Sequence, residues 1–170
     1  IASSNWKERV EAISHLTSFY ESEGGNHVAT FPYLFVLVRD STKSFKESNF
    51  NVARALLEMF TAIFDVHATL VKVPESCICV SATKLAVEKV GDRKLNQASA
   101  ACLNSLCAVK QPSKVLAVAI RAVDSIKSPL VHEALLGWFK SFCSGFGVSS
   151  LSAGVQDCLI WVLKVGYQSY

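Results

Sequence analysis

Helix-forming segments recur along this chain at a spacing of about 40 residues. In one of them, residues 95–109, apolar side chains recur in steps of three and four, which places them on one face of an α-helix. The preceding residues 87–94 predict the end of another helix and a tight charged turn. Gly91 is expected just beyond that helix with a positive φ, because glycine adopts this conformation without steric cost. The stretch therefore predicts a helical hairpin.

The same plan extends over the rest of the sequence. Asn5 is expected to cap a helix that begins at Trp6 and carries Glu8 in its first turn. Prolines at positions 32, 74 and 112 open every second predicted helix, and the helices between them begin near positions 6, 50, 95 and 130. Two helices in about 40 residues are typical of HEAT and armadillo repeats. The sequence therefore predicts an all-α fold without β-sheet, an α-solenoid of antiparallel HEAT-repeat hairpins.

Two further helices complete this plan, and the first of them is assigned from its neighbours. The continuous apolar run at residues 33–38 fits a strand as well as a helix. We assign it to a helix over residues 27–44, because the flanking segments are helical and no partner strand is predicted elsewhere. A last helix is expected over residues 150–165.

Length and composition predict one ordered domain over residues 1–170. Of the 170 residues, 51% are hydrophobic and 18% are charged, which argues against disorder, and the start at Ile1 suggests a fragment of a longer chain. The net charge of +3 is too small to indicate nucleic-acid binding. The sequence contains no apolar run of about 18 residues, the length that a membrane span requires, and no recognisable secretory signal.

The cysteines and histidines do not have the spacing of a metal site. The six cysteines lie in apolar helical segments without a C-x-x-C arrangement, and we expect buried, reduced thiols; they are Cys77, Cys79, Cys102, Cys107, Cys143 and Cys158. The four histidines are scattered. No nucleophile has a recognisable catalytic partner and no glycine-rich phosphate loop is present, so the sequence indicates neither an enzyme nor a cofactor.

The charges are expected to separate onto two edges of the solenoid. The turns within hairpins carry an excess of basic residues, namely Lys7, Lys43, Lys46, Arg93, Lys94 and Lys127 against Glu47 and Asp92. The turns between hairpins carry a more acidic set. Trp6 lies at the start of its helix beside the basic edge, where it is either a lid on the core or an anchor for a partner. The pattern favours protein binding at the basic edge.

Three stretches carry a resemblance to a known family: residues 4–12, which contain the motif W-K-x-R, the charged turn at residues 87–94, and residues 136–151. They resemble the opening and the third within-repeat turn of TOG domains and part of a central TOG domain, respectively. TOG domains are the tubulin-binding HEAT-repeat modules of microtubule polymerases related to chTOG. The resemblance covers nearly all of the chain and implies a monomeric paddle that binds αβ-tubulin or the microtubule lattice, in the cytoplasm at microtubules, the spindle and the centrosome.

Carried over position by position, the resemblance implies a set of tubulin-binding residues in four turns. These are Trp6 and Lys7 in the first turn, Ser48, Asn49 and Phe50 in the second, Arg93 and Lys94 in the third, and Lys127 in the fourth. The alternative is a HEAT-repeat scaffold that binds another protein or a peptide. Such a scaffold is expected to carry regularly placed asparagine, tryptophan or acidic residues along its concave inner helices. Asn51, Asn96 and Asn104 form no such ladder, which favours the tubulin-binding module.

Overall fold

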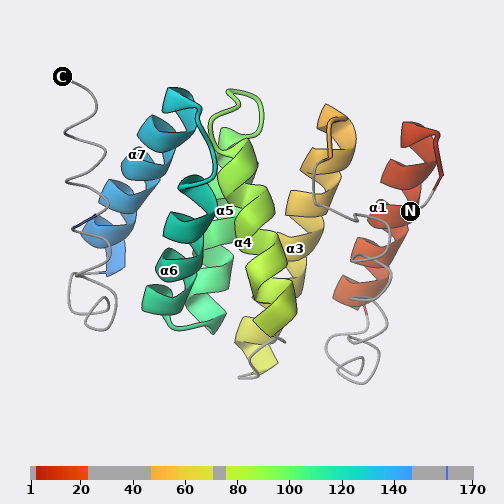
Figure 1. Cartoon of the computed structure of the whole chain (residues 1–170). Helices are drawn as coiled ribbons and strands as arrows, with labels where there is room; N and C mark the ends of the chain where they lie inside the picture. Colours follow the sequence, from red (N-terminus) through yellow and green to blue (C-terminus); the bar gives the residue numbers. More distant parts are fainter. Residues whose placement is uncertain (1–2, 23–46, 71–75, 147–159, 161–170) are drawn as a thin grey trace.

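The structure is a computed structural model that describes residues 3–22, 47–70, 76–146 and 160. These residues form six α-helices and contain no β-strand (Figure 1). The helices are α1 (Trp6–Ser22), α3 (Phe50–Leu70), α4 (Ser76–Lys89), α5 (Asn96–Val109), α6 (Pro112–Val123) and α7 (Pro129–Phe146). The predicted all-α fold is confirmed. The helix predicted over residues 27–44 and nearly all of that over residues 150–165 lie outside the described residues.

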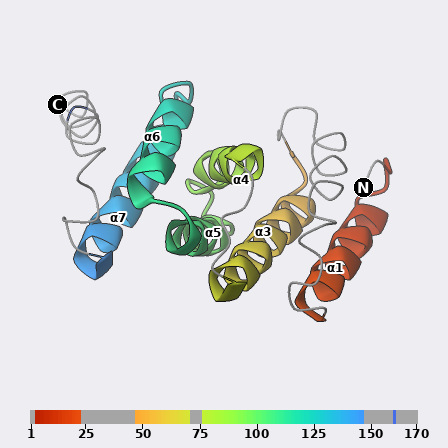
Figure 2. The same cartoon turned by 90° about the horizontal axis from the view of Figure 1, so that it is seen from below.

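The helices form two layers. Helices α1, α3 and α5 pack side by side in one layer, and α4 packs against α6 in the other (Figure 2). Helix α4 also packs along α5, which is the hairpin predicted around Gly91. Helix α7 contacts both α4 and α5, but less extensively than α3 contacts α5. The arrangement is that of a helical-repeat solenoid, because each hairpin buries its apolar face against its neighbours.

Helices α1, α3, α5 and α7 run in the same direction, and α4 and α6 run in the opposite direction. Helices α1, α3, α5 and α7 begin at the upper edge of the molecule in Figure 1, and α4 and α6 end there. The turns that join α4 to α5 and α6 to α7 therefore lie at this edge, together with the starts of α1 and α3. We call it the upper edge; it contains residues 3–9, 47–50, 91–96 and 124–130.

Side-chain caps fix the starts of α1 and α3. The Asn5 Oδ1 atom accepts a hydrogen bond of 3.1 Å from the backbone N–H of Lys7, which confirms the predicted cap. Glu8 supports this cap by accepting hydrogen bonds from Ser3 and from the Asn5 side-chain amide. At α3, the Asn49 Oδ1 atom accepts hydrogen bonds of 3.0 and 3.3 Å from the backbone N–H groups of Asn51 and Val52.

Helix α3 lies at the centre of the hydrophobic core. Its side chains Leu56, Leu57, Phe60 and Phe64 are almost completely buried, and the two phenylalanine rings stack with centroids 6.3 Å apart. Because α3 packs against both α1 and α5, its apolar residues join the two helices into one continuous core. None of the described helices combines the length and the apolar character that crossing a membrane requires.

The described cysteine side chains form no disulfide bonds with one another. Cys79, Cys102 and Cys107 are buried, and Cys143 is half-buried. Burial raises the pKa of the Cys102 and Cys107 thiols to about 12, since a thiolate would lose its hydration in the core. The prediction of buried cysteines is confirmed for Cys79, Cys102 and Cys107, and that of reduced thiols remains a prediction. Cys158 and the side chain of Cys77 lie outside the described part of the chain.

Gly91 is needed for close packing and not for an unusual backbone conformation. The prediction of a positive φ was wrong. A Cβ atom added at Gly91 would lie 2.7 Å from the Val131 Cγ2 atom and 2.9 Å from the Val131 backbone nitrogen. The missing side chain thus allows the α4–α5 turn to contact the first turn of α7. Here the close approach of another helix, which is distant in sequence, determines the residue.

We therefore expect Gly91→Ala to destabilise the fold by about 1–3 kcal/mol, because the Cβ atom would overlap with backbone atoms of Val131. The control is Gly137→Ala on α7, where an added Cβ meets nothing within 4 Å. This change should stabilise the protein by about 0.5–1 kcal/mol, because glycine is unfavourable inside a helix. Urea unfolding followed by circular dichroism measures both. Equal stability of the two variants would contradict the packing role of Gly91.

Candidate protein-binding edge

The structure brings the eight predicted site residues to the upper edge. They lie at the starts of α1 and α3 and in the two described turns that precede α5 and α7 (Figure 1). They are Trp6, Lys7, Ser48, Asn49, Phe50, Arg93, Lys94 and Lys127. Lys43 and Lys46, which were expected at the same edge, lie outside the described residues. The predicted clustering of these residues at one edge is therefore present.

The first part of the edge presents an aromatic side chain to solvent. Trp6 is 38% exposed, so it is not a lid buried in the core. The Lys7 Nζ atom lies 5.8 Å from the centroid of the Trp6 ring, within the range of a cation–π contact. The indole therefore offers apolar contact area directly beside a positive charge.

The second part of the edge is held in place by an ion pair with α1. The Arg9 Nη1 atom donates to the Glu47 Oε2 atom at 2.6 Å, and the other carboxylate oxygen of Glu47 accepts from the backbone N–H of Asn49 at 2.7 Å. The Asn49 side chain caps α3, which makes its main role structural. Ser48 lies between Glu47 and Asn49 and is exposed, so its side chain can contact a partner.

The third part of the edge contacts the second. Asp92 accepts a bond of 2.8 Å from the backbone N–H of Lys94, and this turn places the Lys94 Nζ atom 5.5 Å from the centroid of the Phe50 ring. Two turns that are more than 40 residues apart in sequence thus form a continuous surface. Arg93 is exposed beside them.

The fourth part of the edge contains a residue that sequence reasoning missed. Lys127 is exposed as predicted, and Leu130 in the first turn of α7 is 64% exposed. Leu130 was used only to mark the start of a helix. The signal that could have revealed it is its place directly after Ser128 and Pro129, where it lies outside the apolar stripe formed by Val131, Leu135 and Trp138.

The acidic and the basic side chains of the edge differ in their bonding within the protein. Three carboxylates of the edge form hydrogen bonds within the protein, namely those of Glu8, Glu47 and Asp92. Glu8 and a further carboxylate of the edge, Asp124 at the end of α6, were not counted in the expected charge balance. The four predicted basic side chains form no ion pair within the described part of the chain. Their N–H groups therefore remain available to the carboxylates of a partner.

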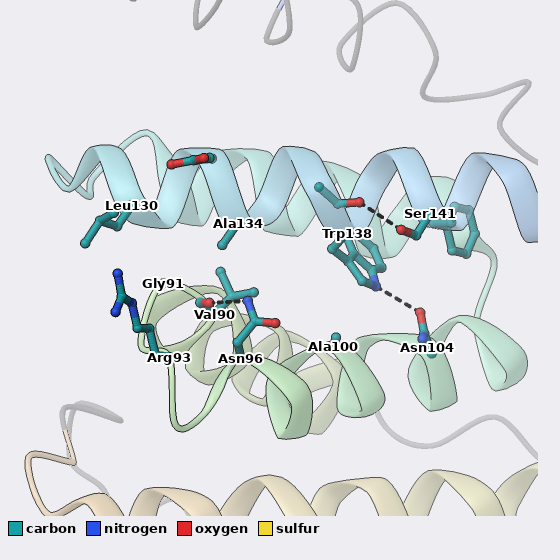
Figure 3. Close-up of a pocket in the computed structure, with 13 residues that line it drawn as sticks. Val90, Gly91, Arg93, Asn96, Ala100, Asn104, Leu130, Ala134, Trp138 and Ser141 are labelled. Atoms are coloured by element: carbon teal, nitrogen blue, oxygen red, sulfur yellow. Dashed lines mark hydrogen bonds between the residues drawn. The ribbon is translucent and has the colours of Figure 1, made fainter.

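A groove lies between α5 and α7 and opens toward the upper edge (Figure 3). Its volume is about 920 Å³. Asn96, Ala100 and Asn104 line it from α5, and Gly137 and Trp138 are among the residues that line it from α7. The three asparagines considered in the sequence do not form a ladder, since Asn51 is not part of the groove. However, Asn96 and Asn104 lie in it together, which their spacing alone had not revealed.

The ion pair between Arg9 and Glu47 is expected to stabilise the edge. Glu47→Ala would leave the partly buried Arg9 guanidinium without its carboxylate and remove a bond to Asn49, at a cost of about 1–3 kcal/mol of unfolding free energy. The Arg9 and Glu47 side chains are 21% and 9% exposed. In the control, Glu58→Ala removes an ion pair with Arg54 in which both side chains are 56% exposed, at a cost of about 0.5 kcal/mol or less. Chemical denaturation compares the two, and equal losses would contradict the structural role of Glu47.

Comparison with known proteins gives one informative similarity. Over 169 residues, which are 99% of this chain, the sequence is 27% identical to Protein MOR1 of Oryza sativa subsp. japonica. The chain spans only 8% of the length of that relative. No family model matches the chain, and no solved structure shows a significant match to it. The similarity to MOR1 supports a TOG-like relation for the chain as a whole.

Proposed function

We propose that this chain is a TOG-like module that binds αβ-tubulin, free or in the microtubule lattice, through the upper edge. The observation that carries the proposal is the alignment of four turns along a single edge, where the exposed Trp6 and the exposed basic side chains of three of the turns lie. The similarity to MOR1 over nearly the whole chain supports the same assignment. No catalytic step is part of this function.

The residues of the edge have different roles in this proposal. Trp6 supplies contact area that becomes buried on binding, since tryptophan is enriched among residues that dominate binding energies. Arg93, Lys94 and Lys127 supply charged hydrogen bonds to an acidic partner surface and accelerate association. Asn49 and Phe50 act indirectly: Asn49 caps α3, and Phe50 positions the ammonium group of Lys94.

The remaining features of the proposal concern the protein around this edge. Residues 1–170 act as one monomeric domain within a longer microtubule regulator, in the cytoplasm at microtubules, the spindle and the centrosome. Several modules on one chain would hold or deliver tubulin together, because linked binding sites raise the effective concentration of their partner. Co-elution of the recombinant chain with purified tubulin at low salt tests the basic activity.

Trp6→Ala is expected to weaken tubulin binding by at least about 2 kcal/mol, because it removes a large aromatic side chain from a contact that excludes water. The loss should appear mainly as faster dissociation in surface plasmon resonance. Phe19→Ala on the same helix is the matched control, since it removes another exposed aromatic side chain, 47% exposed, away from the edge. Equal binding by the parent and the Trp6 variant would exclude Trp6 as an anchor.

Replacing Arg93 and Lys94 together with glutamate is expected to slow association and to flatten its salt dependence. Long-range attraction between charges is screened over about 8 Å at physiological ionic strength, so its loss is visible in the association rate at low salt. The control replaces Lys84 on α4 and Lys114 at the start of α6 with glutamate, which changes the net charge equally away from the upper edge.

Stopped-flow association at several salt concentrations measures these effects, and circular dichroism verifies that helicity is retained. If both double variants associate equally slowly, only net charge matters and the upper edge is not the binding site.

A further inference from the structure

The groove between α5 and α7 has the chemistry of a second binding site. We infer that it binds an extended peptide segment in which an acidic residue is adjacent to a basic one. This inference goes beyond the proposed tubulin contact, because the groove shares only Arg93 with the residues predicted for that contact. Two side-chain amides, small residues along the walls and two opposite charges at the opening point to such a ligand.

Asn96 and Asn104 both line the groove, and in each side-chain amide one of the two polar groups forms no hydrogen bond with another described residue. The Asn96 Nδ2 atom donates to the Val90 carbonyl at 2.7 Å, which leaves the Asn96 Oδ1 atom as a free acceptor. The Asn104 Oδ1 atom accepts from the Trp138 indole N–H at 2.9 Å, which leaves the Asn104 amide hydrogens as free donors. Figure 3 shows both bonds. A peptide backbone offers the complementary groups, since every residue carries an N–H and a C=O.

The spacing of the two amides suits an extended chain. Asn96 and Asn104 lie eight positions apart on α5, which corresponds to about 12 Å along the helix axis. An extended peptide covers this distance with about four residues, at about 3.3 Å each. A helical ligand would not use these groups, because a helix satisfies its backbone hydrogen bonds internally.

Small residues allow a ligand backbone to approach the walls closely. Ala100 on α5 and Ala134 and Gly137 on α7 line the groove, and an added Cβ at Gly137 would meet nothing within 4 Å. Farther along the groove, Trp138 and Phe142 form an aromatic wall with ring centroids 5.5 Å apart. The groove therefore combines room for a main chain with apolar surface.

The charges at the opening determine which peptide fits. Arg93 comes from the α4–α5 turn and Glu133 from α7, and both are exposed and form no ion pair within the described residues. Successive side chains of an extended peptide point to opposite sides. Adjacent acidic and basic residues would thus direct a carboxylate toward Arg93 and a cation toward Glu133.

A blocking variant tests this inference. Gly137→Arg places a long side chain in the groove without a steric clash at its Cβ atom, and Ala100→Arg does so from the opposite wall. Gly145→Arg is the matched control, because Gly145 lies on the same helix in open space and does not line the groove. Thermal unfolding of each variant verifies that it is folded.

The probe is a phage-displayed library of random peptides of about ten residues, enough to span the groove when extended. We expect the parent chain to select peptides with adjacent opposite charges. These should bind the Gly145→Arg variant as well as the parent, but bind Gly137→Arg and Ala100→Arg at least about tenfold more weakly. On binding, the Trp138 indole N–H signal in nuclear magnetic resonance spectra should shift.

Three outcomes would overturn the inference: no selected peptide, equal binding to the folded blocking variants, or selected peptides without neighbouring opposite charges. Tubulin co-elution on the same variants separates this site from the upper edge. Gly137→Arg should retain tubulin binding, and Trp6→Ala should retain peptide binding. A negative result for peptide binding at the groove therefore does not affect the test of tubulin binding at the upper edge, and the reverse also holds.

Discussion

The burial of α3 between α1 and α5 is the interaction on which the rest of the structure depends. An amphipathic helix in a repeat protein cannot cover its apolar surface alone, and α3 has almost completely buried side chains over most of its length, from Val52 to Phe64. Because α3 packs against a neighbour on each side, the three helices are held in one row with the same direction. The second layer, α4 and α6, then covers the other side of α5.

The candidate binding edge is a consequence of this packing. Because the helices of this row run in the same direction, all of them begin at one side of the molecule. Short segments from distant parts of the sequence therefore become neighbours there. The contacts between Arg9 and Glu47 and between Lys94 and Phe50 then connect these segments. The core determines where the edge lies, and the hydrogen-bonded carboxylates of the turns determine which charged groups remain free at it.

The local features of this fold could be predicted from the sequence, and the features that depend on distant contacts could not. Helical periodicity, the Asn5 cap and Pro112 at the start of α6 are properties of adjacent residues, and all three predictions are confirmed. Gly91 was assigned a local role, but its environment is set by Val131 of another hairpin. The groove was not foreseen either, because it depends on how far α7 diverges from α5, and no periodicity in the sequence encodes that angle.

The two contacts that join α7 to the preceding hairpin also determine how the groove responds to a ligand. Val131 packs against Gly91 near one end, and Trp138 is hydrogen-bonded to Asn104 about two turns farther along α7. Two separated points of attachment restrict the pivoting of one helix against the other, so the space between them persists without a ligand. A site that is already open loses little conformational entropy on binding, and its affinity then reflects its contacts more directly than in a site that must first open.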